Sequence, residues 1–145
     1  MSIVVFTTII TGVCVFVTGH ILVKGILDPY LSFKEQLGMV SAILLREQNK
    51  IINLSASNEV IDEIKHASAL LLSKSNAVPL YGAFVKLRLL PQHTSIITAS
   101  RNLNLIASTL EGASNITPRK DYVLVNDSLN AIGRDLRIIV TYKGL

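Results

Sequence analysis

The chain opens with one long apolar stretch and continues with shorter stretches that mix apolar and polar positions. From Ile3 to Val23 there is no Lys, Arg, Asp or Glu. As an α-helix rising about 1.5 Å per residue, this stretch reaches roughly 31 Å, close to the bilayer's hydrocarbon thickness of about 30 Å. The pattern predicts a membrane-spanning helix, with residues 1–27 as a transmembrane anchor and residues 28–145 as a helical bundle domain.

Two other interpretations of the apolar stretch fit it less well. Its 14 β-branched residues would favour strands in water, but a single segment inside a bilayer satisfies its own backbone only as a helix. A cleaved signal peptide would need a basic start, a short apolar core and small residues at its exit. Here nothing basic precedes the core, and Phe16, Val17 and His20 crowd the exit, so we expect an uncleaved anchor.

Beyond the anchor, apolar residues recur at spacings of three, four and seven, which is typical of amphipathic helices. Asp28-Pro29 combines an N-cap residue with a proline at the first helical position, so it predicts a helix start or a kinked continuation of the span. This helix is expected to run to about residue 54, with Arg46, Glu47 and Lys50 facing solvent. Its buried stripe is predicted to be Phe33, Leu37, Val40, Leu44 and Ile51.

The same periodicity predicts three further helices, over about residues 59–75, 91–110 and 117–140. Gly112 is expected to end the second of them, 113–116 to be a linker, and Thr117 to cap the third, in which Gly133 suggests close packing. The predicted buried stripes are Ile61, Ile64, Ser68 and Leu71 or Leu72, then Ile96, Leu103, Ile106 or Ala107, and Leu110, then Val125, Leu129, Ile132, Leu136 and Ile139. The expected fold class is all-α: an N-terminal transmembrane helix followed by a small antiparallel bundle of about four helices.

The segment from Pro79 to Pro91 is bounded by prolines and is too short and too charged to span a bilayer. One interpretation is a short helix or irregular loop that caps the bundle core. The other is an interfacial segment on the membrane surface, with Lys86 and Arg88 toward lipid phosphates and Lys24 anchoring the inner end of the span.

The net charge of +4 is unevenly distributed. Residues 28–63 carry three basic and six acidic side chains, whereas residues 64–110 carry five basic and no acidic ones. The basic part could pair with the acidic part inside the fold, or it could face anionic lipid headgroups. Nucleic acid is not an expected partner, because no basic cluster is interleaved with aromatic residues.

Lys24 and Lys34 follow the span and no Lys or Arg precedes it, so the positive-inside rule places the N-terminus outside and the C-terminal domain in the cytoplasm. Within the span, Thr8, Gly12 and Gly19 share one face, and small residues allow another helix to approach closely. This face is a candidate interface for a homo-oligomer or for another membrane subunit. Alternatively, it reflects only how common Gly and Thr are in spans.

No phosphate-binding glycine loop, HExxH motif, cysteine pair or nucleophile elbow occurs in the sequence. Cys14 lies in the span without a basic neighbour to activate its thiol. His20, His66 and His93 are far apart, and the pairing of His66 with Asp62 on one helical face supplies too few ligands for a metal. We expect no catalytic, metal-binding or cofactor-binding residues, and an enzyme only if residues distant in sequence converge.

Two stretches resemble an uncharacterised family of short bacterial proteins with one N-terminal membrane span and a helical domain. The first runs from Gly19-His20-Ile21-Leu22-Val23-Lys24 through Asp28-Pro29 to Phe33-Lys34-Glu35, and the second from Val78-Pro79-Leu80-Tyr81-Gly82 through Leu89-Leu90-Pro91 into the Ser- and Asn-rich helix of residues 97–110. Family members usually carry Gly-Gln where this chain has Gly19-His20. The likeness covers roughly the first 110 residues. It implies the same architecture and a bacterial inner-membrane location, and it implies no activity.

The leading hypothesis from the sequence is a single-pass, membrane-anchored helical interaction or regulatory module without catalytic activity. Its expected partners are the lipid bilayer and either a second copy or another membrane subunit. The alternative is a small membrane-active effector that oligomerises and perturbs the bilayer.

Overall fold

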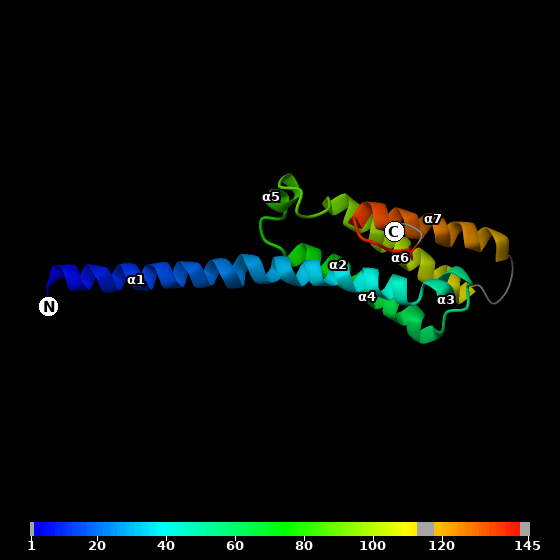
Figure 1. The fold of residues 1–145 in the computed structure, drawn as a ribbon, viewed down its shortest axis with the longest axis horizontal. Helices are drawn as coiled ribbons and strands as arrows, with labels where there is room; N and C mark the ends of the chain where they lie inside the picture. The colour runs from blue at the N-terminus through cyan, green and yellow to red at the C-terminus, as the bar shows by residue number, and fades with distance from the viewer. Residues whose placement is uncertain (1, 113–117, 143–145) are drawn as a thin grey trace.

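The computed structural model describes residues 2–112 and 118–142, in which the regular structure is helical (Figure 1). This confirms the prediction of an all-α chain with one long apolar N-terminal helix. The elements are α1 (Ile3–Leu22), the π-helical segment η1 (Val23–Leu27), α2 (Asp28–Arg46), α3 (Gln48–Ile52), α4 (Asn58–Ala77), α5 (Tyr81–Lys86), α6 (His93–Gly112) and α7 (Pro118–Leu136).

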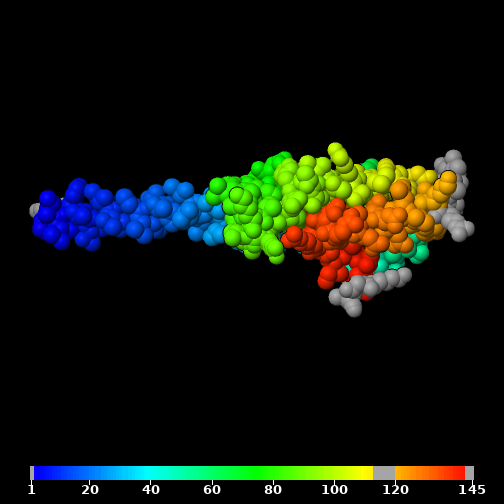
Figure 2. Space-filling view, turned by 90° about the horizontal axis from the view of Figure 1, so that it is seen from above, coloured from blue at the N-terminus to red at the C-terminus, as the bar shows by residue number. Residues whose placement is uncertain are grey.

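The first three elements form one continuous helix of 44 residues, Ile3–Arg46. Its first half extends alone from the rest of the molecule, as Figures 1 and 2 both show. Every residue of α1 is exposed, whereas α2 buries one face. By length and composition, this is a helix that could cross a membrane.

At the junction, α2 continues α1 as one helix, which is one of the two forms expected at Asp28-Pro29. Proline lacks an N–H, and its ring clashes with the carbonyl four residues earlier. In η1 the Asp28 N–H bonds to the Val23 carbonyl, five residues back, and this wider turn accommodates Pro29 without ending the helix. The Asp28 carboxylate pairs with Lys24 at 3.0 Å.

The helices α2, α4, α6 and α7 pack around one core, in which α4 contacts both α2 and α6, and α6 contacts both α4 and α7. One buried polar contact between α4 and α6 is reciprocal. The Ser68 hydroxyl donates to the Ser100 carbonyl at 3.0 Å, and the Ser100 hydroxyl donates to the Ser68 carbonyl at 3.2 Å. Small residues at this contact let the two backbones approach each other.

The predicted buried stripes of α2, α3, α4 and α6 are buried, with Leu71 rather than Leu72 facing the core. The prediction that Glu47 faces solvent is wrong, because only 8% of it is exposed. The helix breaks at this residue (φ −98°, ψ 10°), between α2 and α3, and the break turns its carboxylate onto the surface of the fold between two cations. The expected linker 113–116 and the cap Thr117 lie outside the described residues, and Gly112 is the last described residue of α6.

The last helix is shorter than predicted. It ends at Leu136, because Arg137 has a left-handed backbone (φ 56°) and the Ile138 N–H bonds to the Gly133 carbonyl at 3.2 Å, a Schellman-type ending. Ile139, predicted to continue the buried stripe of α7, therefore leaves the helix and is 48% exposed.

After α7 the chain turns back along α2 and α3. The Ser41 hydroxyl of α2 donates to the Ile139 carbonyl, and the Tyr142 N–H donates to Gln48 Oε1 of α3 at 3.2 Å. Val140 is buried in this returning segment, and a Cβ built on Gly133 would lie 2.9 Å from its Cγ2 atom. Gly133 is thus at a close contact, as its place in the predicted helix suggested.

Candidate functional site

The surface of α1 is apolar and uncovered by the rest of the described chain. Three of its threonine hydroxyls bond to the carbonyl four residues earlier on the same helix: Thr7 to Ile3, Thr8 to Val4 and Thr11 to Thr7, at 2.8–2.9 Å. These bonds leave no free hydroxyl donor on the three side chains, which suits a helix surrounded by lipid.

The residues of the predicted small-residue face lie along one side of α1. Thr8 and Gly12 line one shallow groove, Gly19 lines a second, and Val15 borders both. A Cβ built on Gly12 or Gly19 would meet nothing within 4 Å. The face is therefore open in the described structure, and a partner helix on it remains a prediction.

The segment from Pro79 to Pro91 folds against the start of α2. Tyr30 stacks on Phe84 with ring centroids 4.7 Å apart, and Phe33 meets Tyr81 edge to face at 6.0 Å. The Tyr81 hydroxyl donates to the Pro91 carbonyl at 2.8 Å, and burial raises the pKa of Tyr81 to about 12. The inner side of this segment therefore caps the core.

The outer side of the same segment has a different character. Leu80 and Leu87 are 65% and 68% exposed, and Lys86 and Arg88 are exposed beside them in sequence. This combination of apolar and cationic side chains is the one that an interfacial segment presents to a membrane surface. The two interpretations of the segment thus describe its two sides, and contact of the outer side with lipid remains a prediction.

A network of charges surrounds the break between α2 and α3. Arg46 Nε lies 2.8 Å from Glu47 Oε1, Lys50 Nζ lies 2.7 Å from Glu47 Oε2, and Arg46 also reaches Glu63 Oε2 on α4 at 2.5 Å. Hydrogen bonds from Lys50 and then from Arg46 lower the pKa of Glu47, and the bond to Glu63 raises the pKa of Arg46. The network ties α2 to α4 through the pair of Arg46 with Glu63.

In the part of the chain that the structure describes, no ion pair joins the acids of residues 28–63 to the bases of residues 64–110. Lys65, from the basic part, pairs instead with Glu111 at 2.5 Å. The expected pairing between the two parts is not what holds the fold together. Within residues 2–112 and 118–142, the other four bases of the basic part, Lys74, Lys86, Arg88 and Arg101, form no ion pair.

The histidines lie in three separate places. His20 stacks loosely on Phe16, with ring centroids 6.4 Å apart, and His66 is exposed on α4. His93 contacts Asn76 Oδ1 through Nε2 at 2.9 Å and meets Tyr81 edge to face. Within residues 2–112 and 118–142, no group of three or more His, Cys, Asp or Glu side chains could hold a metal ion.

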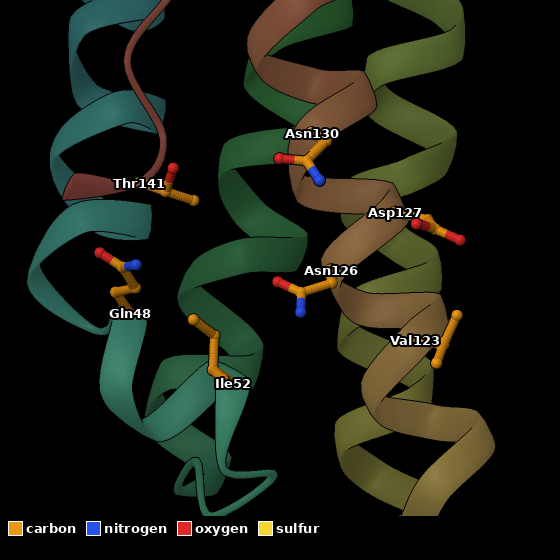
Figure 3. Close-up of a pocket in the computed structure, with 7 residues that line it drawn as sticks. All are labelled: Gln48, Ile52, Val123, Asn126, Asp127, Asn130 and Thr141. Atoms are coloured by element: carbon orange, nitrogen blue, oxygen red, sulfur yellow. The ribbon is translucent and has the colours of Figure 1, made fainter. Parts of the chain in front are cut away.

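A groove of about 410 Å³ lies between α3, α7 and the returning segment (Figure 3). Asn126 and Asn130 of α7 point into it, opposite Gln48 and Thr141, whereas Asp127 lies on the far side of α7 in this view. Amides can hold a partner by hydrogen bonds, but they supply neither a nucleophile nor a base. We did not predict this groove. The spacing of four between the two asparagines, which places both on one helical face, was the available signal.

Comparison with known proteins identifies no relative of this chain. No protein-family model, no curated protein and no solved structure matches it. The resemblance drawn from its two sequence stretches therefore remains a prediction, and a functional proposal depends on the chain's own geometry.

Proposed function

We propose that this chain is a single-pass membrane protein in which the helices after residue 27 form a bundle that acts as an interaction or regulatory module, without catalytic activity. The observation that carries the proposal is the 44-residue helix, whose first 20 residues include no Lys, Arg, Asp or Glu and are mostly apolar and exposed, and whose continuation is packed into a core. In water α1 would leave a large contiguous apolar surface uncovered. A bilayer covers such a surface and requires the continuous helix that the chain forms.

The polar groups of α1 support the same proposal. Three threonine hydroxyls in its N-terminal half bond back to the helix. Lys24 follows directly after the apolar residues, where a long cationic side chain reaches the headgroup layer. We name the segment from Pro79 to Pro91 the capping segment. Its exposed Leu80 and Leu87 are positioned near the start of α2, where the bundle would meet the membrane surface.

The proposed orientation has the N-terminus outside and the bundle in the cytoplasm, in a bacterial inner membrane. Lys24 and Lys34 follow the span, and Lys86 and Arg88 belong to the segment folded against the start of α2. Lysine and arginine residues on one side of a span favour the cytoplasm for that side. In single-cysteine variants lacking Cys14, a membrane-impermeant thiol reagent applied to intact cells should label Ser2→Cys and leave Asn58→Cys unlabelled.

The groove in Figure 3 supports an interaction role more than an enzymatic one. It lies against α3, at the end of the fold remote from α1 in Figure 1, where it would be open to a cytoplasmic partner. Its lining combines three amides and the Thr141 hydroxyl with Asp127, Ile52 and Val123, and such a surface binds by hydrogen bonds and apolar contact.

Membrane extraction tests the anchor. The double variant Ile10→Arg/Val13→Arg should lose integration, because each central Arg costs about 2.5–3.5 kcal/mol in a span. The matched control is Val123→Arg/Leu124→Arg on α7, where the replaced side chains are 58% and 39% exposed, against 47% and 56% at Ile10 and Val13. Wild type and control should remain in the membrane pellet after alkaline carbonate extraction. A wild-type chain in the supernatant would refute the proposal.

The second candidate function is the oligomerising, membrane-active effector. The two shallow grooves that share Val15 on the exposed α1 favour it, because they allow close approach of a second helix. Induced expression with a membrane-potential dye separates the candidates: the effector should depolarise cells, and Gly12→Leu should abolish the effect. Absence of depolarisation would remove this candidate and leave the anchored module.

A further inference from the structure

A second cavity lies where α2, the connection between α5 and α6, and the end of α7 meet. Its volume is about 340 Å³, and we name it the basic cavity. Its floor includes the buried Leu37, Leu90 and Leu136, and its lining includes the exposed cations Lys34, Arg88 and Arg137. Figure 2 shows the orange and red end of the chain beside the green capping segment, as this lining requires.

Three positive charges gather at this cavity from three separate parts of the chain. No acidic residue belongs to its lining. None of the ion pairs formed within residues 2–112 and 118–142 involves Lys34, Arg88 or Arg137. Bringing like charges together is unfavourable, and a bound anion would reverse the sign of that interaction.

The two arginines also hold strained backbone at the cavity. Arg88 and Arg137 have φ values of 59° and 56°, and each follows a helix end at the position where glycine is common. The Leu89 N–H bonds to the Phe84 carbonyl at 2.9 Å, which completes the first of these endings. Leu54 and Leu80 share the left-handed conformation, so the backbone alone does not mark a site. Arg88 and Arg137 differ from these two leucines because they flank the same cavity. At both positions glycine would be less strained.

Helix ends attract cations through their dipoles, and that effect could account for an arginine after α5 and another after α7. It does not account for Lys34, which lies well inside α2 and faces the same cavity. Two guanidinium forks and an ammonium are the groups that bind phosphate oxygens well. The apolar floor suits a small organic group attached to that phosphate.

We propose that the basic cavity binds the phosphate group of a small phosphorylated ligand through Lys34, Arg88 and Arg137. That phosphate could come from a soluble ester or from a phospholipid headgroup. Lys34 follows Lys24 by ten residues, or about 15 Å along the helix, whereas a headgroup layer extends about 5–7 Å beyond the hydrocarbon. This geometry favours the soluble ester. Occupancy would link α2, the capping segment and the end of α7, so it would give the proposed regulatory module a ligand.

The test uses the full chain purified in detergent and titrated with glycerol 3-phosphate at constant ionic strength, with heat of binding as the readout. Saturable binding at one site is expected. Arg88→Gly/Arg137→Gly should raise the Kd at least tenfold while the ligand-free Tm stays the same or rises, because glycine relieves the left-handed backbone. Arg134→Gln on α7, whose side chain is 79% exposed, is the matched control and should leave the Kd unchanged.

A parallel titration uses nanodiscs of phosphatidylglycerol against nanodiscs of phosphatidylcholine. Binding that is seen only with phosphatidylglycerol, and that Arg88→Gly/Arg137→Gly removes, would support the site and assign the phosphate to a lipid. Absence of saturable binding to either probe would overturn the proposal, as would equal binding by the double glycine variant. The cavity is built from residues after the span, so this outcome and the outcome of the carbonate extraction are independent.

Discussion

The helices α1 and α6 both have 20 residues, but α6 is packed into the core and α1 is exposed. Along α6 seven side chains on one face are buried, whereas along α1 none is. The difference follows from the arrangement of polar residues. The polar positions of α6 leave one apolar face, which α4 and α7 cover, while α1 is apolar on every side and no described helix covers it. The apolar face of an amphipathic helix is covered by other helices of the same chain. The surface of a uniformly apolar helix has to be covered by lipid or by another protein.

The largest expected effect contrasts two phenylalanines. Phe33 of α2 is fully buried, whereas Phe16 of α1 is 74% exposed. Phe33→Ala should lower the free energy of unfolding of the packed helices by about 3–5 kcal/mol, because it empties part of the core. Phe16→Ala should leave it unchanged. Thermal unfolding of both variants in detergent, followed by circular dichroism, checks this, and an equal loss in both would break the contrast.

The next effect contrasts small residues at two helix surfaces. Ser100→Leu should cost about 2–4 kcal/mol, because the larger side chain separates α4 from α6 and removes a hydrogen bond. Gly12→Leu adds a side chain where a Cβ would meet nothing within 4 Å, so the unfolding of the packed helices should not change. The same denaturation experiment measures the stability of both variants. A stable Ser100→Leu protein would show that the contact between α4 and α6 is looser than the reciprocal serine bonds indicate.

A smaller effect contrasts two helical glycines. At Gly38 a Cβ would meet nothing within 4 Å, so Gly38→Ala should stabilise the fold by up to about 1 kcal/mol through helix propensity. At Gly133 the same atom would lie 2.9 Å from Val140 and 3.3 Å from the Ile138 carbonyl. Crowding there should outweigh the propensity gain and leave Gly133→Ala less stable by about 1 kcal/mol. The two unfolding midpoints should therefore move in opposite directions.

The smallest effect depends on pH. The pKa of Glu47 is lowered in the folded protein, so its stabilisation is present above the ordinary value of 4.5 and is lost as the pH falls through the folded value. Wild type should have a higher Tm than Glu47→Gln at pH 7, and the difference should vanish in acid. Glu35→Gln, at an exposed position of α2, is the control and should show no such convergence. A constant difference at all pH values would contradict the role of the ion pairs.

Periodicity predicted most of the fold because burial follows it directly: Phe33, Leu103 and Leu129 are buried where their spacing placed them. It failed where the backbone departs from the helix. Nothing in the residue type at Arg137 signals a left-handed turn, so the predicted helix ran past it and placed Ile139 inward. The same holds at Glu47, where a break in the helix places the carboxylate between two cations at the surface and leaves only 8% of the residue exposed.

The functional surfaces were only partly accessible from the sequence. Thr8, Gly12 and Gly19 share a face by spacing alone, and that placement followed from the helix. The basic cavity and the groove of Figure 3 join residues about 50 to 100 positions apart. Whether these distant residues come together depends on how α7 and the returning segment pack against α2 and α3. No local sequence pattern predicts that packing.

The most direct test of the central claim is an accessibility profile along residues 3–46 in liposomes. Nitroxide labels at single cysteines, in a chain carrying Cys14→Ser, report exposure to oxygen in lipid and to a water-soluble nickel chelate. We predict uniformly high oxygen accessibility across α1, then a periodic profile along α2 with minima at Phe33, Leu37, Val40 and Leu44. High accessibility of α1 to the nickel chelate, or a helical period along it with one protected face covered by the chain's own helices, would contradict a lipid-facing span that continues into a packed helix.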